Sequence, residues 1–319
     1  MTSLLTNSAA MVALATLSDI NNNLANTNNR VSTGLRIAQA SDSAAYWAIA
    51  TTTRSDNGAL GTVEDALAIG KATMEVMYNG VESAREGLQE IKQLLVAARQ
   101  PGVNRMNIQT QINGILTDMV NKADASVINE KNFLAIADHD TENMTKSIVA
   151  SFERGTGGTV SVSTIDLDIN GLFLTDGEGT VADREGILDQ TRAGITNSAT
   201  NGGILALQTA GATDPIGDLS DSAADMTTLE GFITAVDAAL TETISAANSV
   251  GVVLARAESQ ESFVAALRDA NERAIGALVD ANMEEESTKL RALQTQQQLA
   301  VQSLAIANNS AQNVLALFG

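Results

Sequence analysis

The longest regular pattern in this chain is an apolar series that alternates steps of three and four residues. Its twelve positions are Leu60, Val63, Leu67, Gly70, Met74, Met77, Val81, Ala84, Leu88, Ile91, Leu95 and Ala98, and all but Gly70 are apolar. This spacing places one apolar stripe along an α-helix, and at 1.5 Å per residue the helix would run roughly 60 Å. Gln100-Pro101-Gly102 then ends it. We therefore expect long helices packed side by side.

Helical periodicity continues in two further regions. A second helix is expected over about residues 105–130, forming an antiparallel hairpin with the first, with one stripe made of Ile108, Ile112, Ile115 and Met119. The pattern resumes near Leu229 and continues through Ile233, Val236, Leu240, Thr243, Ala247, Val250, Leu254 and Ala257. Beyond Ala257 we expect the stripe to shift, as in a coiled-coil stutter, to Phe263, Leu267, Ala270 and Ala274.

Charge is distributed unevenly along the chain. Residues 1–40 carry a net charge of +1 from Asp19, Arg30 and Arg36, and residues 292–319 carry none. The total of −19 leaves −20 on residues 41–291. Both ends still show the three–four spacing, but Asn, Gln, Ser and Ala occupy the faces where a solvated helix usually carries charge. Such helices pack against copies of themselves without like-charge repulsion, so we interpret both ends as partners in one seam of a polymer.

The two terminal seams are read directly from the spacing. The N-terminal seam comprises Ala10, Ala13, Leu17, Ile20, Leu24, Thr27 and Val31, and the C-terminal seam comprises Leu290, Leu293, Gln297, Ala300, Leu304, Ala307, Ala311, Val314 and Phe318. In a free monomer we expect these ends to lack a stable partner surface, because a small seam does not offset the entropy of ordering.

Composition excludes several classes of function. The chain has no Cys and one His, so it offers no disulfide, thiolate nucleophile or Cys-based zinc site, nor the two-His motif of a metalloprotease. The charge of −19 argues against binding nucleic acid, because phosphate contacts require Lys and Arg. The first eighteen residues are too polar for a membrane span, and the basic start of a secretory signal is missing. We expect no cofactor, no metal and no membrane insertion.

Residues 139–228 follow a different pattern. Alternating apolar residues over 160–169 are followed by Asn170-Gly171 and Leu172–Leu174, which predicts a β-hairpin that turns at Asn-Gly. The rest is rich in Gly, Thr, Asp and Asn. We predict a mainly α protein: a long antiparallel helical bundle with terminal coiled-coil helices and a small β-containing central insertion. The expected domains are 1–42 with 279–319 as the terminal coiled coil, 43–138 with 229–278 as the helical bundle, and 139–228 as a variable, surface-exposed insertion.

Three sequence blocks resemble the bacterial flagellins, the subunits of the flagellar filament. They are STGLRI at 32–37, ASDSAAYW at 40–47 and the run from Asp280 to Phe318. The Tyr46-Trp47 pair is similar to alphaproteobacterial flagellins in particular. The resemblance covers about residues 1–135 and 229–319, at both ends and in the right order, and leaves the central part unmatched.

The resemblance implies a structural protein with no active site, which polymerises into the extracellular filament that propels the cell. Family members form a tube, with the terminal helices inside, the bundle around them and the middle facing solvent. It further implies export without a cleavable signal through the flagellar apparatus, with an export chaperone, the filament cap and the hook–filament junction proteins as partners. The expected polymerisation interface consists of Ala10, Leu17, Ile20, Leu24, Val31, Leu293, Ala300, Leu304, Ala307, Val314 and Phe318.

A second segment invites comparison within the family. Leu88–Ala97 resembles the flagellin stretch that packs neighbouring subunits and is seen by an innate immune receptor. The family usually has Arg where this chain has Glu90 and Lys92, and Lys does not replace the bidentate guanidinium. We therefore predict weak receptor activation. Leu88, Ile91 and Leu95 also suit the bundle core.

Other groupings have plain explanations. Glu284-Glu285-Glu286 near a helix start is interpreted as a solvated face that suits the helix dipole, and Met74 and Met77 as core filling. His139, beside Asp138 and Asp140, is expected to be an exposed loop residue and not a catalytic base. Gly155-Thr156-Gly157-Gly158 lacks the Lys-Ser/Thr ending of a phosphate loop.

Three alternatives to a filament subunit remain open from sequence. A hook–filament junction protein shares similar ends but would not elongate filaments. An enzyme could reside in the central insertion, although that segment offers one His. A generic coiled-coil scaffold would account for the heptads but not for uncharged ends.

Overall fold

The computed structural model describes residues 7–128, 130–137, 139–155, 157–177, 181–195, 202–208 and 215–318, with the backbone alone at 181 and 310–318. The described chain forms two compact units, one made of residues 1–58 and 267–319 and the other of residues 59–266. Five α-helices dominate it: α1 (Ser8–Thr33), α2 (Ala44–Ala98), α3 (Arg105–Ala125), α4 (Ala223–Val279) and α5 (Met283–Phe318). The mainly α prediction is confirmed.

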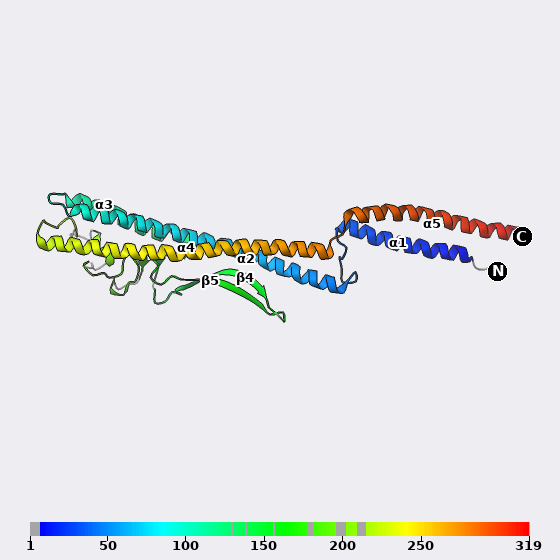
Figure 1. The fold of residues 1–319 in the computed structure, drawn as a ribbon, viewed down its shortest axis with the longest axis horizontal. Coiled ribbons are helices and arrows are strands. Elements are labelled where there is room, and N and C mark those ends of the chain that lie inside the picture. The colour runs from blue at the N-terminus through cyan, green and yellow to red at the C-terminus, as the bar shows by residue number, and fades with distance from the viewer. Residues whose placement is uncertain are drawn as a thin grey trace. The chain divides into compact units, whose positions relative to one another are not determined.

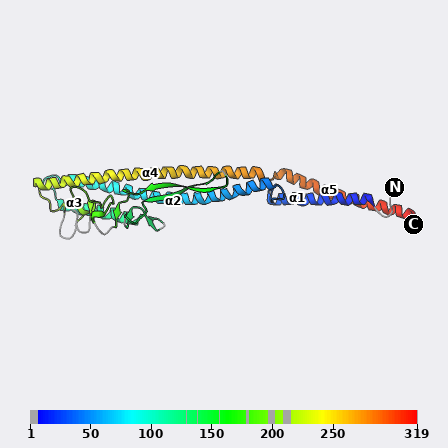
Figure 2. The ribbon, with the colours of Figure 1, turned by 90° about the horizontal axis from the view of Figure 1, so that it is seen from below.

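In the unit of residues 59–266, α2 and α4 run antiparallel, side by side in both views (Figures 1 and 2). Four ion pairs fix this direction, with α4 numbers falling as α2 numbers rise: Lys71 with Glu258 and Glu261, Lys92 with Asp237, and Arg99 with Glu230. The predicted helical hairpin is also confirmed, because α3 returns along α2. A Cβ on Gly87 would lie 2.5 Å from the sulfur of Met119.

The core of this unit follows the predicted stripe. All eleven apolar residues of the 60–98 series are buried, and Gly70 is half-buried. α3 contributes Ile108, Ile112 and Met119 as expected. It also buries Leu116, whereas Ile115 is half-buried.

The predicted stripe shift in α4 is wrong. Phe263 is 56% exposed, and Ala270 and Ala274 are exposed. The buried residues are instead Val264, Ile275 and Val279, which follow Ala257 in steps of three and four, and Leu267 of the predicted stripe is half-buried. The bulk of Phe263 suggested a core position, but the helix turns that side chain outward.

α4 is long and apolar enough, by composition alone, to cross a membrane. Part of that apolar stretch, 39%, is covered, and Val236, Ala239 and Val250 are fully buried in the helical unit. Its composition is therefore that of a core helix.

The β-structure differs from the predicted hairpin. β4 (Thr145–Arg154) pairs antiparallel with β5 (Val160–Asp168), with a bulge between Val149 and Ser151. The turn lies at Gly155–Thr159, where Gly157 and Gly158 have positive φ, so the glycine cluster makes the hairpin. Asn170-Gly171 leads instead towards β6 (Thr175–Asp176), which pairs in parallel with β3 (Ala135–Ile136). A third small pair joins β1 (Val127–Ile128) and β2 (Lys131–Asn132).

The central segment is anchored to the helices by buried polar side chains. Gln109 of α3 donates to the carbonyl of Leu207 at 2.7 Å and accepts from the N–H of Ile216 at 2.8 Å. Arg105 donates to the carbonyls of Ala98 and Leu219 and pairs with Asp221. Two short 3₁₀ helices complete the segment, at Val181–Asp183 and at Gly203–Leu207, the second entirely buried. This loop-rich region is thus fixed by specific contacts.

In the unit of residues 1–58 and 267–319, the links between helices hold each other. Leu35 and Asp280 form an isolated antiparallel bridge, and the N–H of Ala281 donates to the carbonyl of Gly34 at 2.9 Å. Beside this link, Ile37, Ala50, Ile275 and Val279 make a small apolar core. Gly34 ends α1 in the left-handed conformation, with φ of 71°.

Candidate polymerisation surface

The predicted terminal seams lie against each other within one chain, which corrects the expectation that these ends lack a partner surface in a single subunit. α1 and α5 run antiparallel and side by side in both views (Figures 1 and 2). The described seam residues are the less exposed positions of each helix. Ala10, Leu17, Ile20, Leu24 and Val31 are half-buried on α1, and on α5 Leu293 is buried while Ala300, Leu304 and Ala307 are half-buried. The side chains of Val314 and Phe318 lie outside the described residues.

Amide groups, more than charges, hold this pair in register. Asn7 caps α1 by accepting from the N–H of Ala10 and donates to the carbonyl of Ala307 at 3.1 Å. Further along, Gln297 donates to Asn21 at 2.7 Å. In these contacts Asn and Gln side chains join the two helices without adding net charge.

One charged pair is built into the seam, and it corrects the interpretation of the glutamate run. Glu284 and Glu285 are exposed in the first turn of α5, but Glu286 is 7% exposed and pairs with Arg30 of α1 at 3.1 Å. Its Oε1 accepts that bond, whereas its Oε2 is buried without a hydrogen-bond partner among the described residues. The helix dipole and Arg30 together compensate the carboxylate, so Glu286 fixes how α1 meets α5.

The outer faces of the same two helices carry large apolar side chains that sequence analysis did not single out. Six of them are at least half exposed: Met11, Val12, Leu14, Leu299, Val301 and Ile306. They lie between seam positions in the sequence, so a search for a single apolar stripe on each helix does not select them. Two helices shield only the faces that they share, and the remaining faces stay exposed.

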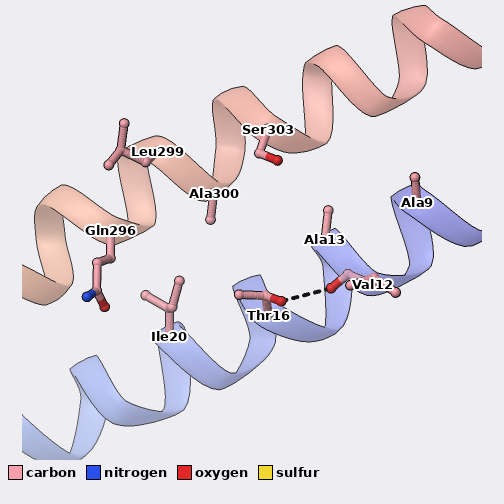
Figure 3. Close-up of a pocket in the computed structure, with 9 residues that line it drawn as sticks. All are labelled: Ala9, Val12, Ala13, Thr16, Ile20, Gln296, Leu299, Ala300 and Ser303. Carbon is pink, nitrogen blue, oxygen red and sulfur yellow. Dashed lines mark hydrogen bonds between the residues drawn. The ribbon is translucent and has the colours of Figure 1, made fainter.

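A groove of about 570 Å³ runs between α1 and α5 beside this surface. It is lined by Ala9, Val12, Ala13, Thr16, Ile20, Gln296, Leu299, Ala300 and Ser303. Figure 3 shows Ile20 and Ala13 directed from α1 towards Gln296 and Ala300 of α5, with small side chains between the helices. None of the lining residues is charged, so the groove suits an apolar, uncharged helix surface.

Comparison with known proteins identifies the family. The model of the bacterial flagellin N-terminal helical region matches residues 4–137, and that of the C-terminal helical region matches residues 233–318. Flagellin C of Rhizobium meliloti (strain 1021) is 41% identical, covering 100% of this chain and 99% of the relative. Flagellin A of Rhizobium meliloti is 37% identical with both chains fully covered, and a Brucella melitensis flagellin is 35% identical.

The chain belongs to the bacterial flagellin family. It is therefore a structural subunit of the extracellular flagellar filament, as the resemblance of the terminal blocks implied. The two matched regions include α1, α5 and most of the helical bundle, which are the elements that carry the seams and the exposed faces.

The segment that resembles the flagellin receptor stretch presents few of its predicted residues to solvent. Leu88, Ile91 and Leu95 are 0% exposed and belong to the bundle core. Glu90 is exposed, and Lys92 is half-buried and paired with Asp237 of α4. Glu90 is thus the most accessible of the five. Weak receptor activation stays a prediction, and a cell reporter assay with monomer checks it.

The surroundings of His139 correct the expectation of an exposed ring. Its side chain is 16% exposed, and its Nδ1 lies 2.7 Å from Oδ2 of the buried Asp176. Burial by itself lowers the pKa of His139, but the hydrogen bond and charge of Asp176, with the charges of Glu185 and Asp140, outweigh it and raise the pKa. Asp138 lies outside the described residues. The pair joins the loop after β3 to β6, and this arrangement can hold a charged ring in place.

No group of three or more His, Cys, Asp or Glu side chains in the described part of the chain is arranged to hold a metal ion. The glycine cluster at 155–158, with Thr156 outside the described residues, forms the β4–β5 turn.

Proposed function

We propose that this flagellin polymerises through the exposed apolar side chains of α1 and α5. The seam residues Ala10, Leu17, Ile20, Leu24, Val31, Leu293, Ala300, Leu304 and Ala307 join the two helices within a subunit, and the three–four spacing of the sequence assigns Val314 and Phe318 to the same seam. The exposed apolar side chains beside the seam then join one subunit to others. The supporting observation is that six large apolar residues stay exposed on the two parts of the helix pair that carry no charge, residues 8–18 and 292–318.

Substitution of exposed residues provides the direct test. Leu299 and Ile306 are 59% and 66% exposed in the subunit, so Leu299→Gln with Ile306→Gln should leave the helical circular dichroism of the monomer unchanged. Filament growth from seeds should need a concentration at least tenfold higher, because each buried aliphatic side chain contributes roughly 1.5–3 kcal/mol.

The matched control keeps the apolar character at both positions. Leu299→Met with Ile306→Met should elongate seeds nearly as well as the unchanged chain, because Met fills similar volume. Normal filament growth by the double Gln variant, measured by electron microscopy and light scattering, would refute the proposed interface.

Removal of the C-terminal seam tests the role of the pair as a whole. A chain lacking residues 292–319 should be a soluble, helical monomer that forms no filaments, because α1 then loses most of its partner helix. The full chain should elongate seeds into long filaments, which a hook–filament junction protein would not do.

We further propose that the domains occupy successive layers of the filament. Residues 1–42 with 279–319 form the inner tube, 43–138 with 229–278 the bundle around it, and 139–228 the outward-facing part. The charge pattern supports this order, because 32 of the 38 acidic residues lie in the outer two layers. Cryo-electron microscopy of filaments tests it by locating the β4–β5 hairpin.

We also propose export through the flagellar apparatus, with an export chaperone, the filament cap and the junction proteins as partners. Family membership and a chain without Cys, which threads unfolded without crosslinking, support this. Secretion should stop when the export apparatus is inactivated. We propose no enzymatic role for the insertion, and assembled filaments should not cleave casein.

A further inference from the structure

The first turns of α2 are uncharged and exposed on nearly every side. From Ser43 to Thr53 the sequence contains no charged residue, and between Ala44 and Thr52 the single buried side chain is Ala50, which packs on Ile37, Ile275 and Val279. Tyr46, Trp47 and Ile49 are 49%, 38% and 53% exposed. Three large apolar side chains therefore share about one helical turn in solvent.

Hydrogen bonds hold the start of α2 in place. The helix starts from a fixed link, where the Asp42 carboxylate accepts from the N–H groups of Ala38 and Gln39 at 2.9 and 3.1 Å. The N–H of Trp47 then donates to the carbonyl of Ser43 at 2.9 Å. The aromatic rings thus lie on the first turns of a regular helix whose start is held by these hydrogen bonds.

The choice of residues indicates an interface. The chain has one Trp and two Tyr, and two of these three side chains lie in this exposed turn. Single exposed apolar residues are ordinary on a protein surface, but a contiguous group marks an interaction site. Trp and Tyr are also the residues most enriched among the anchors of protein interfaces.

Charge favours a second copy of this chain as the occupant. Two subunits with a net charge of −19 repel each other, so close approach is least costly where both surfaces are uncharged. The turn belongs to the same compact unit as α1 and α5, in which residues 8–18 and 292–318 carry no charge. Copies brought together by those helices reach high local concentration beside it.

We propose that Tyr46, Trp47 and Ile49 form a second contact between copies of this flagellin, separate from the α1–α5 faces, with Trp47 as its anchor. The inference rests on the proposed polymerisation. It adds a specific surface, on α2, that the terminal seams do not include.

Trp47 is the one Trp of the chain, so intrinsic fluorescence reports on this contact alone. Monomer should show the red emission and easy acrylamide quenching of an exposed indole. On polymerisation the emission should shift to the blue, and quenching should fall severalfold. Filaments that form normally while Trp47 stays fully quenchable would overturn this inference and leave the proposed function intact.

Substitution gives an independent test. Trp47→Ala should raise the concentration needed for seeded growth about ten- to thirtyfold, as expected for loss of an interface anchor. Trp47→Phe should restore most of the growth, because it keeps the ring. Ile69→Gln, on an exposed position of the same helix, is the control and should cause a much smaller change.

A lipid surface is the competing occupant. A blue shift when monomer meets anionic or neutral vesicles, without any shift in filaments, would assign the turn to membrane and reject the contact between copies. If the unchanged chain fails to grow on seeds at all, the proposed polymerisation fails first and this contact fails with it.

Discussion

Asp189 makes the stability of the helical unit depend on pH. Its side chain is buried, and its Oδ2 accepts from the N–H of Asp176 at 2.7 Å. Its Oδ1 has no hydrogen-bond partner among the described residues. Burial raises the pKa of Asp189 to about 6 from its ordinary 3.8, aided by the charge of Asp176 and opposed by the hydrogen bond from the Asp176 N–H and by the charge of Arg184. Compared with the unfolded chain, the folded protein therefore favours the protonated form of this carboxyl.

The magnitude follows from the two pKa values. With the folded pKa at about 6 and the unfolded value near 3.8, the ionised carboxylate lowers the free energy of unfolding by roughly 3 kcal/mol. Because the pKa is higher in the folded state, the full loss of stability is present above the folded pKa and disappears as the pH falls towards the unfolded pKa.

His139 changes stability in the same direction. Its pKa is raised in the folded state, so the stabilisation by its charged ring is present below the unfolded pKa of about 6.5 and is lost as the pH rises through the folded value. Both groups therefore predict that the monomer is more stable at mildly acidic pH than at pH 8.

Asp189→Asn isolates the carboxyl contribution. The amide oxygen still accepts from the Asp176 N–H, while the NH₂ group left without an acceptor costs roughly 1 kcal/mol. The variant should thus be about 2 kcal/mol more stable than the unchanged chain at pH 8, with a flatter dependence on pH. Urea unfolding of dilute monomer, followed by far-ultraviolet circular dichroism, measures both. Asp166→Asn, at an exposed position of β5, should leave the pH dependence unchanged. An Asn variant with the original slope between pH 5 and 8 would refute the reasoning.

Three further substitutions test the packing. Gly70→Ala places a Cβ 2.3 Å from Cγ2 of Ile148 and should lower the free energy of urea unfolding by about 1–2 kcal/mol. In an Ile148→Ala background the same change should raise the free energy of unfolding, because Ala has a better helix propensity than Gly. Arg30→Met leaves the buried Glu286 unpaired and should lower the melting temperature of filaments. The double variant Arg30→Met with Glu286→Leu removes both charges and should lower it less. Equal melting temperatures of the two variants would contradict this. In Gly34→Ala the added Cβ meets no atom within 4 Å, but the residue must keep φ at +71°. The variant should therefore lose roughly 1 kcal/mol of stability in the same melting assay, whereas Gly34→Asn should be closer in stability to the unchanged chain.

Periodicity predicts the helix cores of this protein well. The three–four series of α2 identifies its buried residues because a long helix that packs along its whole length must bury one continuous stripe. The terminal series likewise identify the covered positions of α1 and α5. In each case the partner helix runs alongside, so the buried positions repeat regularly and can be predicted from the local sequence pattern.

Contacts made by single polar side chains are not predictable in this way. Arg105 and Gln109 are 7% and 1% exposed, yet a search for apolar stripes discards them. Their partners are backbone groups and a carboxylate between Leu207 and Asp221, and no period describes the path of that loop. The same holds for Glu286, whose burial depends on Arg30 of a distant helix.

One copy of the chain buries the bundle but not the terminal helices. α2 buries eleven residues of its stripe, whereas among the described side chains of α1 and α5 those that are buried are Thr27, Glu286 and Leu293. The six exposed apolar residues of the pair would contribute on the order of 10 kcal/mol if all were buried on assembly. Association itself costs an estimated 4–15 kcal/mol, so contact with one neighbour, covering part of that surface, is marginal. A subunit is then held firmly only where several neighbours cover it together, which is the condition that a growing filament end provides and a pair of free subunits does not.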